Sequence, residues 1–354
     1  MNSWLTESKS QLQEDIFEFL WRQWDSLGVA GVSQSDDNRI IDPEALLLFS
    51  LSACRYEPRL FDEIIDWLFT NGQFINVQRL QQIQNKYDFK CGPQLSALAG
   101  LLSRKSTYKL KWSALAKKYY QEPAMPLFLD KDGIPLPCPR ENDANADFLS
   151  HGLIRGGINL RGYSRTFDPN ITASLLLRLR ALLGINARAE ILCLLASEKE
   201  LHPSEAARRT AYYQRTIQTT LVEMSQSGVV SVRTSNKEKY YRLKPGILDA
   251  LLKPDGRQPK WINWPDLLKA VETLWLKLAA LSAMTLDPIL LTSELKKLMR
   301  AVYENYPNCD IDWVATDANI RIEDFSEKFQ QQLRLISDKL LKVSNQMGAE
   351  TSYK

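Results

Sequence analysis

The stretch from Ile185 to Pro245 constrains the fold of this chain more than any other part of the sequence. Its first half predicts three consecutive helices, and its second half predicts two short strands joined by a polar turn. The first helix begins near Asn186, a residue type that favours the N-cap position. The second begins at Pro203, which suits the first helical position because proline has no amide hydrogen to donate. Three helices followed by a hairpin are therefore the structural unit that the sequence predicts most clearly.

The third predicted helix runs from about Tyr213 to Gln226 and has two different faces. Ile217, Leu221 and Met224 follow the i, i+4, i+7 spacing of a helix, so we expect this face to pack into a core. The opposite face and the N-terminal tip carry side chains that can form hydrogen bonds: Tyr213, Gln214, Arg215, Gln218 and Thr219.

The hairpin is predicted from residues that alternate in polarity on both sides of a turn. Val230 and Val232 alternate with polar neighbours, and Tyr241 and Leu243 do the same after the turn. This period of two is typical of strands with one buried face. The polar residues at and near the tip are Asn236, Lys237 and Lys239.

This order of elements resembles the winged helix-turn-helix domain of bacterial transcriptional regulators of the ArsR and MarR type. The resemblance covers residues 175–245 and includes the sequence Ser-Gly-Val-Val, a basic hairpin and Tyr-Tyr-Arg-Leu. It implies that the third helix lies in the major groove of double-stranded DNA, and that the hairpin, or wing, touches the flanking backbone or minor groove. The residues implied to read bases are Gln214, Arg215, Gln218 and Thr219, with Arg233, Lys237 and Lys239 as wing contacts and Arg208 and Arg209 at phosphates.

Two departures from the family pattern limit what the resemblance implies. The turn before the third helix reads Ala211-Tyr212-Tyr213, where the family has a glycine followed by a polar cap. The register of the reading residues can therefore shift by about one position. Cys193 stands alone in the first helix, so the cysteine pair of metal-sensing relatives is missing and metal sensing is not implied.

The residue types on the third helix suit base recognition. Arginine can pair with O6 and N7 of guanine, and glutamine with N6 and N7 of adenine. Two alternatives remain open at this point. The polar residues can simply cover a solvated helix face, or the domain can be a non-enzymatic adaptor that binds protein. An adaptor has no need of Arg215, Arg233, Lys237 and Lys239 on one side.

Charge is distributed unevenly along the 354 residues. Residues 1–90 contain 8 Lys and Arg against 14 Asp and Glu, whereas residues 178–260 contain 15 against 8. The basic excess thus coincides with the predicted winged helix, as a surface that binds phosphates requires. The acidic N-terminal part is expected to bind no DNA but could bind a protein partner.

Four regions are expected in a mainly α fold. Residues 1–120 read as a helical N-terminal domain, 121–172 as an irregular connection rich in proline and glycine, 173–252 as the winged helix, and 261–348 as a helical C-terminal region. A helix, an Asn-Gly turn and a helix at 59–86 suggest a second helix-turn-helix, which we expect to serve packing or protein interaction. A heptad pattern in the last helix is compatible with a homodimer or with packing inside the chain, on Phe329, Leu333, Ile336, Leu340, Val343 and Met347.

Other functional classes find little support in the sequence. The two histidines, His151 and His202, belong to no catalytic motif, and neither a P-loop nor a dinucleotide-binding glycine motif is present. The carboxylate pairs Asp130/Asp132 and Asp310/Asp312 lie in predicted loops and favour a solvated surface. We therefore expect no enzyme activity, cofactor or metal.

The five cysteines are scattered without a CxxC pair, and no run of about 18 apolar residues or signal-peptide pattern occurs. A cytoplasmic protein without membrane contact is expected. The sequence as a whole predicts a sequence-specific DNA-binding transcriptional regulator, with repression by promoter blocking as its mechanism.

Overall fold

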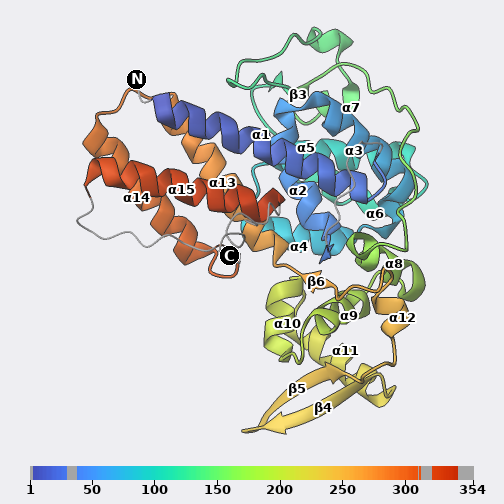
Figure 1. Ribbon diagram of the computed structural model, residues 1–354. Coiled ribbons are helices and arrows are strands. Elements are labelled where there is room, and N and C mark those ends of the chain that lie inside the picture. Colours follow the sequence, from blue (N-terminus) through green and yellow to red (C-terminus); the bar gives the residue numbers. More distant parts are fainter. Residues whose placement is uncertain (1–2, 30–37, 310, 312–320, 342–354) are drawn as a thin grey trace, which may run out of the picture.

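The computed structural model describes residues 3–29, 38–309, 311 and 321–341. Within these ranges the chain is mainly helical, as the sequence predicts, and its strands are few and short. Most helices form a large helical body, and the others form a smaller lobe that extends from it (Figure 1). None of the described helices is long and apolar enough to cross a membrane.

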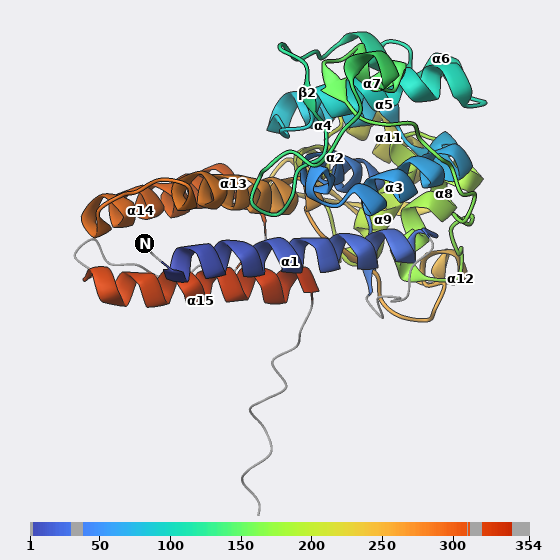
Figure 2. The ribbon, with the colours of Figure 1, turned by 90° about the horizontal axis from the view of Figure 1, so that it is seen from above.

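The helical body is built from both ends of the chain around one hydrophobic core. Its first and last helices lie along each other in both views (Figures 1 and 2). The predicted N-terminal and C-terminal helical regions thus contribute to the same core. The helices of the body are α1 (Ser3–Ser26), α2 (Pro43–Ala53), α3 (Pro58–Asn71), α4 (Val77–Tyr87), α5 (Gly92–Lys105), α13 (Trp264–Ser282), α14 (Pro288–Asn305) and α15 (Ile322–Leu341).

Helix α2 lies at the centre of the body, and its sequence explains why. Asp42 caps its N-terminus by accepting hydrogen bonds from the amides of Glu44 and Ala45, and Pro43 occupies the first turn. Every residue of α2 is buried, as the apolar run that follows Glu44 predicts. A helix that is apolar on all sides must be covered on all sides, and α13, α4, α5 and α1 pack around it.

The heptad residues of α15 pack inside the chain. Phe329, Leu333, Ile336 and Leu340 are buried, and the ring of Trp4 in α1 meets Phe329 edge-on with 6.3 Å between centroids. Val343 and Met347 lie outside the described residues. Because α1 covers this seam, a homodimer would need a different surface.

The predicted irregular connection, 121–172, contains only short elements. β2 (Met125–Pro126) pairs in parallel with β3 (Leu153–Ile154), and the short α7 (Ala146–Leu149) lies between them in sequence. The preceding segment forms α6 (Lys109–Trp112) and a single 3-10 turn, Leu115–Lys117.

Arg155 of this connection belongs to the body. Its side chain is 3% exposed, forms an ion pair of 2.8 Å with Asp62 and lies against the rings of Phe61, Phe128 and Phe148. Arg155 therefore pairs with the acidic N-terminal part of the chain and does not lie on an exposed surface.

The smaller lobe, which we call the hairpin lobe, comprises residues 175–252 and has its own core. The β1 strand (Arg39–Ile40) pairs in parallel with β6 (Lys260–Trp261), and Ile40 and Trp261 pack into the core of this lobe. Its elements are α8 (Leu175–Leu183), α9 (Ala187–Ser197), α10 (Pro203–Thr210), α11 (Gln214–Gln226), β4 (Val230–Ser235), β5 (Glu238–Leu243) and α12 (Asp249–Leu252).

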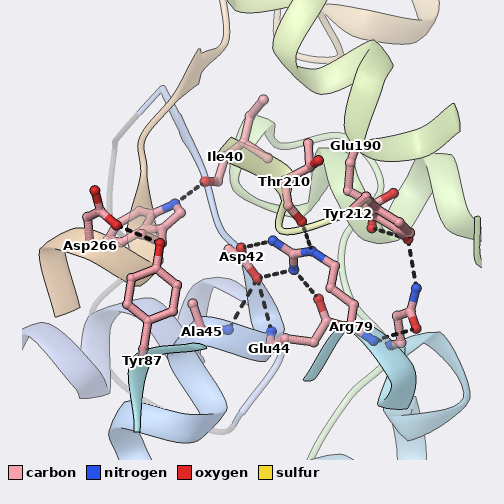
Figure 3. A network of polar contacts seen from close by, with 12 residues as sticks. Ile40, Asp42, Glu44, Ala45, Arg79, Tyr87, Glu190, Thr210, Tyr212 and Asp266 are labelled. Atoms are coloured by element: carbon pink, nitrogen blue, oxygen red, sulfur yellow. Dashed lines mark hydrogen bonds and ion pairs between the residues drawn. The ribbon is translucent and has the colours of Figure 1, made fainter. Parts of the chain in front are cut away.

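A buried cluster of charged side chains joins the body to the hairpin lobe. Arg79 of α4 donates hydrogen bonds to Asp42 and Glu44, and its Nε donates to the carbonyl of Thr210 at 2.7 Å, at the end of α10 (Figure 3). Arg180 of α8 joins Glu44 to Glu190 of α9, with 2.6 Å to each carboxylate. We call these five side chains the buried ion cluster; all are fully buried.

The contacts of α4 explain why it cannot serve as the reading helix of a second helix-turn-helix. Arg79 is buried in the ion cluster, and Val77, Leu80 and Ile83 face the core. The helix pair at 59–86 is therefore a packing element, as the sequence suggests.

Removal of one partner from the buried ion cluster should destabilise the protein strongly. Arg79→Leu removes the positive charge that pairs with Asp42 and one of the two that pair with Glu44. We expect the unfolding free energy, measured by urea denaturation, to fall by about 3–5 kcal/mol. The control is Arg188→Ala, which breaks an exposed pair with Glu223 and should cost at most about 1 kcal/mol. Equal effects of the two substitutions would contradict this role of the cluster.

The same cluster predicts sensitivity to acid. Burial alone would raise the pKa of Glu44, but the charge and hydrogen bonds of Arg180, and then the charge of Arg79, lower it from 4.5 to about 2. A folded pKa below the unfolded one means that Glu44 contributes its full stability above pH 4.5 and loses it as the pH falls towards 2.

The difference in unfolding free energy between wild type and Glu44→Gln should therefore shrink as the pH falls through this window. Glu18→Gln, which alters an exposed pair with Arg22, should show almost no such trend. A difference for Glu44→Gln that is independent of pH would contradict the assignment.

Candidate nucleic-acid interface

The candidate interface is built on α10, α11 and the hairpin of β4 and β5, and the hairpin lies at the end of the molecule away from the body (Figure 1). α10 and α11 are joined by a turn of three residues. Ala211 ends α10 in the left-handed conformation, with φ of 58°, where the resembling family has glycine. The turn therefore takes the left-handed conformation without glycine, at the cost of some backbone strain.

Helix α11 has the two faces that the sequence predicts. Ile217, Leu221 and Met224 are buried against the lobe, with Thr220 beside them. Tyr213 is the N-cap residue and is 72% exposed. The four residues of α11 that are predicted to read bases, Gln214, Arg215, Gln218 and Thr219, are all exposed. Thr216, Val222, Glu223 and Gln226 of the same helix are exposed too.

The hairpin has the register that places its polar residues at the tip. Ser235 pairs with Glu238, which leaves Asn236 and Lys237 as a two-residue turn. Their φ values are 48° and 68°, as in a type I′ turn, whose twist matches that of the strands. Asn236, Lys237 and Lys239 are exposed, and β4 packs beside α11.

Three of the predicted basic contacts are held in ion pairs within the chain. Arg208 pairs with Glu205, and Arg209 with Glu198 at 2.8 Å. Arg233 makes two hydrogen bonds to Glu200, of 2.9 and 2.6 Å, and lies over the ring of Tyr240. Arg209–Glu198 and Arg233–Glu200 join different elements, so the linear order of charges does not reveal them, whereas Glu205 and Arg208 lie three residues apart on α10.

The other predicted cations are free to meet an anion. Arg215, Lys237 and Lys239 are exposed and form no hydrogen bond or ion pair with the described residues. Arg188 and Glu223 neutralise each other at 2.6 Å, as the three pairs above do. The surface of residues 187–243 then keeps one glutamate, Glu238, and five cations: Lys199, Arg215, Lys237, Lys239 and Arg242.

The structure thus divides the residues predicted from the sequence into two groups. The α11 face and the wing tip form an exposed surface on adjoining elements, with Tyr213 at one end. Arg208, Arg209 and Arg233 lie nearby, but carboxylates already occupy their guanidinium groups. Sequence reasoning did not single out Lys199 and Arg242; the alternation that buries Tyr241 could have identified Arg242 as exposed.

Tyr212 is a further residue that the sequence did not single out. Its hydroxyl accepts a hydrogen bond of 2.7 Å from Asn76 of the body and donates one of 3.4 Å to Glu190 (Figure 3). Burial, and then the charge of Glu190, raise the pKa of this hydroxyl, so it remains protonated. Together with the bond from Arg79 to Thr210, it attaches the turn before α11 to the helical body.

Known proteins add nothing to this geometry. No protein-family model matches the chain, and neither a curated protein nor a solved structure shows significant similarity to it.

Two lysines at and beside the wing tip allow the effect of backbone conformation on stability to be separated from the effect of charge. Lys237 has a left-handed backbone that glycine adopts without strain, so Lys237→Gly should raise the unfolding free energy by about 0.5–1 kcal/mol in urea denaturation. Lys239→Gly removes the same charge within β5 and should lower it by a similar amount, because glycine weakens strands. If both substitutions destabilise the protein alike, the type I′ turn is wrong.

Proposed function

We propose that the hairpin lobe is a winged helix and that the protein is a sequence-specific DNA-binding transcriptional regulator. In this proposal α11 enters the major groove and the β4–β5 hairpin is the wing. The observation that carries the proposal is the exposed face on which Arg215, Lys237 and Lys239 have no acidic partner among the described residues, while the neighbouring arginines do. The positive charge of this surface is therefore available to a polyanion such as DNA.

The proposed contacts follow from the position of each side chain. Arg215 and Gln218 lie on the exposed face of α11 and have the donors and acceptors that read guanine and adenine in the major groove. Lys237 and Lys239 lie at and beside the wing tip, where they would meet phosphates. Repression by occupying a promoter needs no further chemistry than this binding.

The internal ion pairs refine the set of contacts. Arg208, Arg209 and Arg233 would each have to leave a glutamate before binding a phosphate, so their net contribution should be small. We therefore assign them to holding α10 and the wing in place, and we assign binding to the free cations.

The test begins with selection of a binding site from a pool of random double-stranded DNA, followed by fluorescence anisotropy over a series of salt concentrations. Arg215→Ala should cost about 1–3 kcal/mol on the selected site and relax its sequence preference. Lys237→Ala should weaken all sequences alike and reduce the salt slope by about one unit.

Two controls make the test specific to this surface. Lys297→Ala removes one positive charge from α14, which lies on a different part of the molecule (Figure 1), and should leave binding unchanged. Arg209→Ala should have a smaller effect than Arg215→Ala. Absence of binding at low salt would refute DNA recognition and direct attention to protein partners of an adaptor.

A further inference from the structure

A cavity outside the hairpin lobe contains charged side chains that the proposed DNA contact does not use. It has a volume of about 310 Å³ and lies between α3 and the segment 157–161, which belongs to the chain that descends from β3 to α8 (Figure 1). Gly157, Asn159 and Arg161 are exposed, so this segment forms the mouth of the cavity. The charged side chains that line it are the carboxylates Asp62, Glu63 and Asp66 of α3, together with Arg59 and Arg161.

Two of the three carboxylates have partners of their own. Asp62 forms an ion pair of 2.8 Å with Arg155, which is itself buried. Asp66 accepts hydrogen bonds from the backbone amides of Gly162 at 3.1 Å and Ser164 at 3.0 Å. These contacts hold the segment against α3 and give the cavity a defined wall.

Glu63 is different, because it is buried and forms no hydrogen bond or ion pair with the described residues. The residue is only 6% exposed, and its Oε2 forms no hydrogen bond with any described residue. Arg161 and Arg59 attract it only from a longer range, and burial, followed by the charge of Asp66, raises the pKa of Glu63. A buried carboxylate without a partner is costly, so this position favours a positively charged group from outside.

The surroundings define the chemistry of that group. No three His, Cys, Asp or Glu side chains in the described part of the chain are arranged to hold a metal ion, which favours a cation that donates hydrogen bonds. The volume lies at the small end of the range of about 300–1,000 Å³ for small-molecule sites. The guanidinium of Arg59 lies over the ring of Trp21, 5.3 Å from its centroid, and does not fill the position beside Glu63.

We infer that this cavity binds a primary ammonium group, with the Glu63 carboxylate as its direct partner. The group comes from a small amine or from a lysine side chain of another protein, since both present the same three N–H donors. The ammonium enters at the mouth formed by segment 157–161 and forms a charge-assisted hydrogen bond with the Glu63 carboxylate. The inference does not depend on DNA binding, because no residue of the hairpin lobe takes part in it.

The experiment measures binding of propylammonium, putrescine and Nα-acetyl-lysine N-methylamide to the full chain by calorimetry and thermal unfolding at constant ionic strength. We expect saturable binding of propylammonium and a rise in Tm. Glu63→Gln, which keeps the shape and removes the charge, should weaken binding by about tenfold or more, as loss of a charge-assisted contact does. Tighter binding of putrescine would identify a free amine as the source, and tighter binding of the lysine derivative would identify a protein side chain.

The control is Glu57→Gln, which removes a carboxylate at the N-cap of the same helix but outside the cavity and should bind like wild type. Glu63→Gln should also be at least as stable as wild type in urea, because it no longer buries an unpaired charge. Absence of saturable binding of all three amines, or equal affinity of wild type and Glu63→Gln, would overturn the inference. Destabilisation by Glu63→Gln would overturn it as well, since Glu63 would then have a structural partner.

Discussion

The buried ion cluster is the interaction on which the arrangement of this molecule depends. Three carboxylates and two guanidinium groups are enclosed without access to water, and they come from α2, α4, α8, α9 and the cap of α2. Desolvation of such groups is costly, and only good geometry compensates for it. Hydrogen bonds to guanidinium groups are directional, so the cluster specifies one orientation between the helical body and the hairpin lobe, whereas apolar packing alone would tolerate several.

That orientation has a consequence for the proposed reading helix. Arg79 binds the last carbonyl of α10, and Asn76 binds the hydroxyl of Tyr212, so the turn that aims α11 is attached to the body as well as to its own lobe. A contact surface that is held on a rigid support loses less conformational freedom on binding. The same attachment means that any change in the body that moves α4 also moves the start of α11.

Charges at the surface follow a different rule from charges in the interior. Arg209 and Arg233 pair with glutamates on neighbouring elements, and Arg208 pairs with Glu205 of its own helix. These pairs contribute little stability but remove the cations from the open surface. A count of charges along the chain cannot distinguish them from Arg215, Lys237 and Lys239, because pairing depends on which turns and strands lie side by side. Glu63 differs from Asp62 and Asp66 because its Oε2 has no hydrogen-bond partner among the described residues. The order of residues along α3 does not predict this difference.

Local patterns in the sequence determined much of the hairpin lobe. The spacing of Ile217, Leu221 and Met224 defined the buried face of α11, and the alternation around Val230 and Tyr241 defined the hairpin and its tip, because both depend only on the geometry of one element and its nearest neighbour. The tertiary structure alone decided that both ends of the chain share one core, that α15 packs on α1, and that Arg79 and Arg180 are buried beneath the lobe. These features join residues far apart in the chain, and the energy that selects them arises only when those residues leave water together.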